Sequence, residues 1–151
     1  MNSNSRLSAA LHALLHMLAH DTPMTSEALA VCLRTNPVVV RRTLSGLRKA
    51  GLVRSQKGRG GGWSVDCDFA TVTLLDVYRA VDSPALLASA RLDRAPACPV
   101  EQSVSETLDS AFHDAEAQLL AQFGALTLAA LAADIDRRIA ERFSRAFPPH
   151  S

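Results

Sequence analysis

The Lys and Arg residues of this chain are the ones whose type and spacing point most clearly to a chemical role, which is binding to phosphate. No carboxylate occurs between Glu27 and Asp66, and this interval contains eight cations: Arg34, Arg41, Arg42, Arg48, Lys49, Arg54, Lys57 and Arg59. From residue 95 to residue 136 the chain has seven carboxylates and no Lys or Arg. The basic block attracts phosphate and the acidic block repels it, although the net charge is only +1. This separation is typical of a DNA-binding head with a protein-facing tail.

The basic block contains a predicted helix that begins at Asn36 and ends at Ala50–Gly51. Asn36 can cap a helix, Pro37 suits its first position, and Gly51 tolerates the left-handed backbone that closes it. Winding at 100° per residue gives a packing face of Val40, Leu44 and Leu47. The opposite face carries Val38, Arg42, Ser45 and Lys49. An apolar residue on a cationic face suits contact with thymine methyl groups in a major groove.

A glycine-rich hairpin is expected directly after this helix. Its first strand starts at Leu52–Val53, its turn spans residues 57 to 62, and its second strand is Trp63 to Val65. Ahead of the basic helix, Thr25 is expected to cap a short helix that contains Glu27, so the two helices form a helix-turn-helix. The hairpin would then present Lys57 and Arg59 beside that pair.

The helix-turn-helix, followed by Gly51-Leu52-Val53 and by residues 55 to 63 (SQKGRGGGW), resembles the Rrf-two family of bacterial winged-helix transcriptional regulators. The resemblance covers nearly the whole chain. It implies a homodimer that binds double-stranded DNA at an inverted-repeat operator, with one helix per subunit in the major groove and one wing in the minor groove. The DNA-binding residues it implies are Thr25, Asn36, Val38, Val39, Arg41, Arg42, Ser45, Lys57 and Arg59. Lys57 stands where cluster-binding relatives use a wing Arg, so either Lys57 or Arg59 enters the minor groove.

The expected fold is mainly α with a small β-wing. Residues 1–82 would form the winged helix-turn-helix domain, including a first helix over residues 6–20 and another from Thr73 to Val81. Residues 83–98 would be a linker with one further turn over 85–89, and residues 99–151 would be dimerisation helices that pack with the N-terminal helix. The long helix starts at Pro99 and carries the predicted dimerisation residues Val104, Leu108, Phe112, Ala115 and Leu119.

This helix is too long for so small a head to bury, so a partner subunit is expected; the alternative is a helix folded back on its own domain. Gly124 is expected to stop it. A final helix is marked by Leu126, Leu128, Leu131, Ile135, Ile139 and Phe143.

Cys98 is the candidate sensing thiol. Relatives that hold an iron–sulfur cluster take three closely spaced cysteines from the linker, whereas this linker offers only Cys98, so a conventional cluster and other cofactors are not expected. Cys98-Pro99-Val100-Glu101 resembles the Cys-Pro-Val-Gly segment of the cluster-free branch. At a helix N-cap the thiolate of Cys98 would be stabilised, although Glu101 opposes this. A redox-sensing or electrophile-sensing thiol and a buried packing cysteine are the two interpretations.

Histidines at positions 12, 16 and 20 recur every fourth residue and could chelate a metal, although no third ligand is evident. Solvated or interface histidines are the alternative. Two rivals therefore remain to a repressor that responds to a redox or small-molecule signal. One is a metal-responsive, iron–sulfur-responsive or haem-responsive sensor that uses these N-terminal histidines, and the other is an interaction module whose basic face binds an acidic protein. The chain lacks a nucleotide-binding loop and a motif-placed catalytic triad, so no enzyme is expected. With no membrane span and no secretory signal, a cytoplasmic location is expected.

Overall fold

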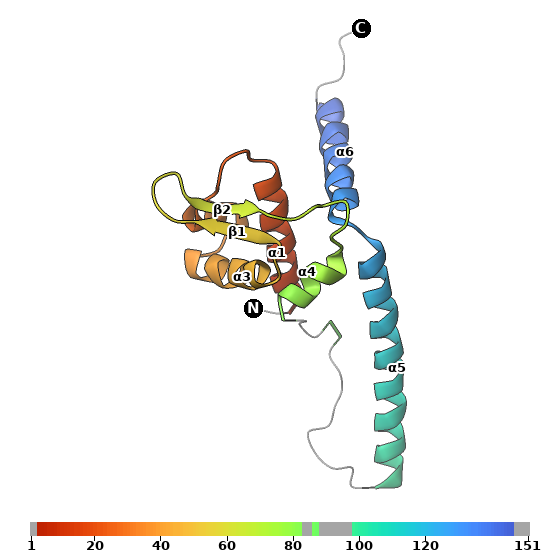
Figure 1. Ribbon diagram of the computed structural model, residues 1–151. Helices are drawn as coiled ribbons and strands as arrows, with labels where there is room; N and C mark the ends of the chain where they lie inside the picture. The colour runs from red at the N-terminus through yellow and green to blue at the C-terminus, as the bar shows by residue number, and fades with distance from the viewer. Residues whose placement is uncertain (1–2, 83–85, 88–97, 147–151) are drawn as a thin grey trace.

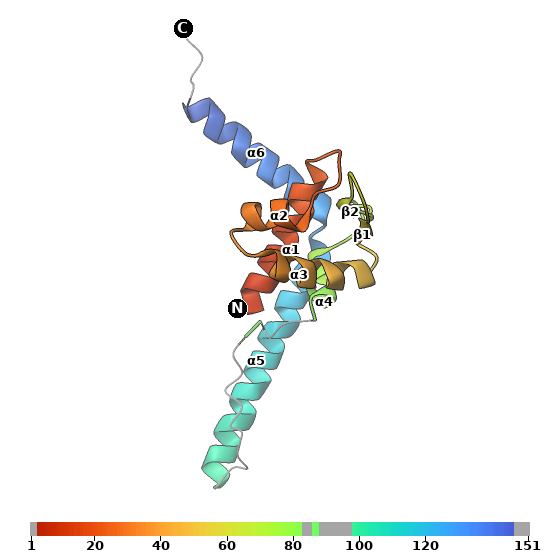
Figure 2. The ribbon, with the colours of Figure 1, turned by 90° about the vertical axis from the view of Figure 1, so that its left-hand side faces the viewer.

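The computed structural model describes residues 3–82, 86–87 and 98–146, which form six helices and a two-stranded antiparallel sheet (Figure 1). In chain order the elements are α1 (Ser3–Leu18), α2 (Ser26–Leu33), α3 (Pro37–Lys49), β1 (Val53–Gln56), β2 (Gly62–Val65), α4 (Leu74–Ala80), α5 (Pro99–Ala125) and α6 (Leu128–Ala146). The first four helices and the sheet form a head, and α5 and α6 run along one side of it and extend beyond it (Figures 1 and 2). The predicted fold class, mainly helical with a small β-hairpin, is confirmed.

Two helix starts follow directly from side chains that cap them. The Oδ1 of Asn36 accepts a hydrogen bond from the Val39 N–H at 3.1 Å, and Pro37 occupies the first turn of α3. At α4 the Asp76 N–H donates to Thr73 Oγ1, and the Thr73 N–H donates to the Asp76 carboxylate. This reciprocal capping satisfies N–H groups that a helix cannot satisfy within its own first turn.

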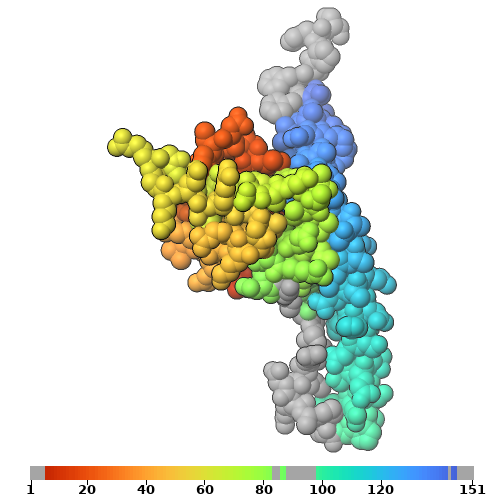
Figure 3. All heavy atoms as spheres, in the orientation of Figure 1, coloured from red at the N-terminus to blue at the C-terminus, as the bar shows by residue number. Residues whose placement is uncertain are grey.

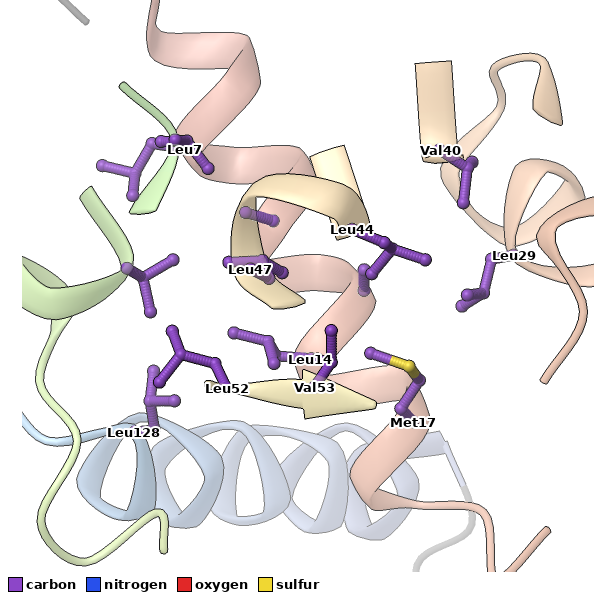
Figure 4. Packing of buried hydrophobic residues seen from close by; sticks show 14 of the residues in the cluster. Leu7, Leu14, Met17, Leu29, Val40, Leu44, Leu47, Leu52, Val53 and Leu128 are labelled. Atoms are coloured by element: carbon purple, nitrogen blue, oxygen red, sulfur yellow. The ribbon is translucent and has the colours of Figure 1, made fainter. Parts of the chain in front are cut away.

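The head has one hydrophobic core to which nearly every element contributes (Figure 4). Its largest fully buried side chains are Leu14, Leu29, Val40, Leu44, Leu47, Val53, Val77 and Leu128. They come from α1, α2, α3, β1, α4 and the first residue of α6. Because Leu128 lies in this core and Ala129 and Leu131 pack against it, the first turn of α6 belongs to the head, and the C-terminal part of the helix extends beyond it.

The prediction that Gly124 ends the long helix is wrong, because α5 continues to Ala125. The interruption instead lies at residues 126–127, where tertiary hydrogen bonds hold the backbone extended. The Leu74 N–H donates to the Leu126 carbonyl, and the Leu128 N–H donates to the Val72 carbonyl, both at 2.9 Å. Leu126, expected in the final helix, therefore lies before it.

The first helix was also misplaced by two to three residues, since α1 runs from Ser3 to Leu18 rather than from 6 to 20. The predicted turn over residues 85–89 lies largely outside the described residues, and the irregular segment 91–96 lies wholly outside them. Within the described ranges, no helix is both long enough and apolar enough to cross a membrane.

Candidate DNA-binding surface

A tight turn fixes α3 against α2. Thr25 caps α2 by accepting a hydrogen bond from the Ala28 N–H at 3.1 Å. Arg34 ends α2 in the left-handed conformation, with φ 52°, and the Thr35 N–H donates to the Ala30 carbonyl at 3.0 Å. Asn36 then starts α3. The predicted residues Thr25 and Asn36 thus lie at two exposed helix N-termini, where unpaired N–H groups favour phosphate.

The two faces of α3 are those expected from its winding. Val40, Leu44 and Leu47 are buried, while Val38 is 63% exposed and Arg42 and Lys49 are exposed. Val39 and Ser45 are half-buried at the borders between the two faces. The exposed face therefore combines an apolar side chain near the helix start with cations further along.

Arg41 and Arg48 each interact with another part of the head. The Arg41 Nη2 lies 3.4 Å from the Glu27 Oε1, and both side chains are largely exposed. Such a surface ion pair contributes only about 0–1 kcal/mol, so a phosphate can displace it. Arg48, in contrast, lies over the Trp63 ring at 6.0 Å and donates to Ser55 Oγ at 3.3 Å. Arg48 thus supports the wing. Arg42, unlike Arg41, makes no ion pair with any residue that the structure describes.

The turn of the wing, in yellow, projects from the head (Figure 3). Val53 pairs with Val65 and Gln56 pairs with Gly62, which leaves residues 57–61 as the connecting turn. Gly58 and Gly60 have φ values of 91° and 74°, a region that glycine adopts without strain. Lys57 and Arg59 alternate with these glycines, and both side chains are exposed. Their exposure does not distinguish Lys57 from Arg59 as the candidate for a minor-groove contact.

Trp63 holds the wing against the start of α2. The main chains of Met24 and Trp63 exchange two hydrogen bonds, of 2.9 and 2.8 Å. The Trp63 Nε1 donates to the Oγ of Ser26, a buried residue, at 3.0 Å. A Cβ on Gly62 would lie 2.6 Å from the Met24 carbonyl oxygen, so this approach requires glycine. Sequence analysis placed Trp63 in the strand but missed Met24 and Ser26.

A groove between α3 and the end of α4 extends the cationic surface. It is lined by Arg41, Arg42, Ser45, Gly46, Lys49, Ala50, Arg79, Ala80 and Asp82. A Cβ on Gly46 would lie 2.6 Å from the Ala80 carbonyl oxygen, so glycine allows α4 to approach α3 closely. Arg79, which sequence analysis did not select, is thereby brought beside Arg42. Asp82 is the one carboxylate along this groove among the described residues.

Along α5, the predicted dimerisation residues are incompletely covered. Val104 is 54% exposed, Leu108 is 42% exposed, Ala115 is exposed, and Phe112 and Leu119 are half-buried. None of the described α5 side chains is buried. The helix meets the head near its C-terminal end, where Phe123 lies edge-on to Tyr78 with ring centroids 6.0 Å apart. The rest of α5 is not folded back on the head.

Cys98 caps α5, as predicted: its Sγ accepts from the Glu101 N–H at 3.5 Å. It is exposed, so it is not buried within its own protomer. Cys32 and Cys67 are half-buried and pack against the core of the head. Burial raises the pKa of the Cys67 thiol, and the charges of Asp66 and Asp68 raise it further. Cys98 is therefore the thiol most open to solvent.

Comparisons with known proteins agree with this geometry. The family model Rrf2, the Rrf-two family, described as an iron-dependent transcriptional regulator, matches residues 3–134. YwnA of Bacillus subtilis, named as an HTH-type transcriptional regulator, is 39% identical over 113 residues, which cover 75% of this chain and 84% of YwnA. A crystal structure from Lactobacillus plantarum, described as a transcriptional regulator, aligns with a TM-score of 0.75 and 30% identity over 94% of this chain and 98% of that one.

More distant structures share the fold alone. CymR, the global cysteine regulator of B. subtilis, aligns with a TM-score of 0.57 at 21% identity, over 85% of this chain and 93% of CymR. The description of the family as iron-dependent raises the question of whether this chain could hold an iron–sulfur cluster. The residues do not fit a cluster. Cys32 and Cys67 pack against the core of the head, whereas Cys98 precedes Pro99 at the N-terminal end of α5, the end that projects away from the head (Figure 1). In the described ranges, no three His, Cys, Asp or Glu side chains are grouped to hold a metal.

Proposed function

This chain belongs to the Rrf2 family of transcriptional regulators, and we propose that it is a homodimeric repressor that binds an inverted-repeat operator. The observation that carries the proposal is a single surface made by two elements. The exposed face of α3, with Val38 and Arg42, lies beside a wing that Trp63 fixes in place. In this arrangement α3 enters the major groove and the wing follows the adjacent minor groove.

Each DNA-contacting residue has a proposed role set by its position. Asn36, Val38, Val39, Arg41 and Arg42, at the start of α3, meet base edges; all of them are exposed except Val39, which is half-buried. Thr25 and Ser45 border the same surface. Arg79, which lines the groove beside Arg42, is added as a phosphate contact.

Lys57 and Arg59 are the proposed minor-groove contacts of the wing. Both are exposed at its tip, and Arg suits a narrow A-tract groove better than Lys does. We therefore favour Arg59 for insertion and Lys57 for a phosphate. Binding to DNA also implies a cytoplasmic location for this regulator.

The proposed dimer covers the apolar stripe of α5. With 27 residues, α5 is about 40 Å long at 1.5 Å per residue. Its exposed residues Val104 and Leu108 lie far from the head's core, so a second subunit is the partner that best covers them. A largely apolar hollow between α1, α5 and α6, lined in part by Leu11, Leu15, Leu119 and Ile135, offers a further surface for that subunit. Residues 1–82 would then be the DNA-binding domain, 83–98 the linker and 99–151 the dimerisation region.

Two-fold symmetry predicts the form of the operator. Paired recognition helices require half-sites about one helical turn apart, or a multiple of it. To test the function, genomic fragments are first enriched on the purified full chain and sequenced. The enriched fragments are then used in gel shifts with unlabelled competitor DNA. The proposal expects an inverted repeat that random DNA does not displace. Equal competition by random DNA and by enriched DNA would instead favour a module whose basic face binds an acidic protein.

The proposed signal is oxidation or alkylation of Cys98. Its exposure and its place at the N-cap of α5 distinguish it from Cys32 and Cys67, which pack against the core. Mild peroxide is expected to weaken operator binding by the native chain but not by Cys98→Ser, with Cys67→Ser as the matched control. Unchanged binding by the oxidised native chain, or a loss that persists in Cys98→Ser, removes Cys98 as the sensor and leaves a small-molecule signal as the alternative.

A further inference from the structure

Two histidines on α1 have ring nitrogens directed at one another. His12 and His16 stand one turn apart, with ring centroids separated by 4.7 Å and planes tilted by 32°. Their Nε2 atoms lie 3.0 Å apart. His20 is not grouped with them: its Nδ1 donates to the His16 carbonyl oxygen at 2.8 Å, and among the described residues no three side chains of His, Cys, Asp or Glu are gathered to hold a metal. The histidine series predicted as a possible metal chelate is thus a pair with a third ring turned toward the backbone.

The separation of the two nitrogens matches two neighbouring ligands of one metal ion. Imidazole nitrogens bind divalent transition metals at about 2.0–2.1 Å. Two such bonds that end 3.0 Å apart subtend an angle of about 94° at the metal. A tetrahedral ion would need nitrogens about 3.3–3.4 Å apart, whereas square-planar or tetragonal coordination needs about 2.9 Å. The pair therefore lies closer to tetragonal than to tetrahedral geometry.

Without metal, the 3.0 Å contact is a hydrogen bond in which one Nε2–H donates to the lone pair of the other. Metal binding replaces this bond: the donor ring then carries its proton on Nδ1 instead of Nε2, so that both Nε2 lone pairs are free to bind the ion. Within one protomer His12 is exposed and His16 is half-buried, so an ion can reach the pair there; His12 also borders the hollow proposed for the second subunit.

We propose that His12 and His16 form a two-histidine chelate for a divalent transition-metal ion, with preference for Cu2+ over Ni2+ and Zn2+ and with water in the remaining positions. Tetragonal coordination by nitrogen and oxygen ligands is typical of Cu2+ and Ni2+, and the affinity of nitrogen sites rises from Ni2+ to Cu2+ and falls again at Zn2+. The site is independent of the proposed DNA-binding function. It lies near the helix-turn-helix, since His12 also borders a hollow lined by Leu33, Arg34 and Thr35.

The test is calorimetric titration of the tag-free full chain with CuCl2, NiCl2 and ZnCl2 in separate experiments. Single variants His12→Ala and His16→Ala remove one ligand each. The matched controls are His20→Ala, on the same helix outside the pair, and His113→Ala, an exposed histidine of α5. Circular dichroism checks that all variants keep their helix content. Metal binding at thiols or at the N-terminal amine is unchanged by these substitutions and so is the same in every variant. The Ni2+ experiment also avoids the thiol oxidation that Cu2+ can cause.

The expected result is that one Cu2+ site per protomer, apart from any thiol or N-terminal site, weakens at least about tenfold in His12→Ala and in His16→Ala, since even outer-sphere partners alter metal affinity by 10–100-fold. The two controls should bind as the native chain does. Substoichiometric Cu2+ should also broaden the imidazole NMR signals of His12 and His16 before those of His113. Native Cu2+ affinity in His12→Ala or His16→Ala, equal weakening in all four variants, or tighter binding of Zn2+ than of Cu2+ overturns the proposal.

Discussion

Removing the indole N–H of Trp63 tests whether one hydrogen bond joins the wing to the helix-turn-helix. In Trp63→Phe the Ser26 Oγ loses its 3.0 Å donor, and Ser26 is only 8% exposed. A buried polar group left without a partner costs about 1–3 kcal/mol. The main-chain bonds between Met24 and residue 63 persist in this variant. We therefore expect a less stable head that still carries a wing.

A double-mutant cycle isolates the contribution of this bond. Ser26→Ala alone should cost about 0.5–1.5 kcal/mol, because the Trp63 N–H is only half-buried and can bind water. In the double variant no hydroxyl is left unpaired, so the combined loss should fall short of the sum by about 1 kcal/mol. Urea unfolding of all four chains, followed by circular dichroism, measures the four free energies. Losses that add to within about 0.3–0.5 kcal/mol would refute the coupling.

Three further perturbations address DNA reading, assembly and acid stability. Arg42→Ala should weaken binding to cognate DNA by about 1–3 kcal/mol with little effect on random DNA, whereas Lys57→Ala should weaken binding to cognate and random DNA alike and lower the salt slope by about one. Fluorescence anisotropy at several salt concentrations distinguishes the two variants. Equal losses for Arg42→Ala on cognate and random DNA count against base reading. Val104→Asp combined with Leu108→Asp should leave the head folded but sediment as a monomer, and a persistent dimer would exclude this stripe as the interface. Hydrogen bonds from Arg138 and Arg137 lower the pKa of Asp134 below its ordinary value of 3.8, so its stabilisation is present above that pH and disappears as the pH falls through the lowered pKa. Urea unfolding between pH 2 and 6 should show this loss in the native chain and not in Asp134→Asn, and identical profiles would contradict it.

Local chemistry made much of the fold predictable from sequence. Asn36 before Pro37, and Thr73 three residues before Asp76, begin helices where their side chains can cap them, and both starts are confirmed. The inward face of α3 follows from helical periodicity alone. Each of these features depends on residues within about one helical turn of one another.

Features that depend on distant residues could not be predicted in this way. The hydrogen bond from Trp63 to Ser26 joins positions 37 residues apart. The break between α5 and α6 depends on backbone bonds from Leu74 and Leu128, so Gly124 was a misleading stop signal. Arg79 reaches the cationic groove only because Gly46 allows α4 to approach α3. Tertiary contacts overrode or supplemented the local pattern in each case.

Hydroxyl-radical footprinting of the operator tests most directly whether α3 and the wing read DNA as one two-fold surface. We predict two protected half-sites related by a dyad, each with a minor-groove position whose protection disappears in Lys57→Ala combined with Arg59→Ala. The two wing cations are exposed at the tip, so the major-groove contacts of α3 should survive their loss. A single asymmetric footprint, or minor-groove protection that the double variant leaves unchanged, would contradict this account.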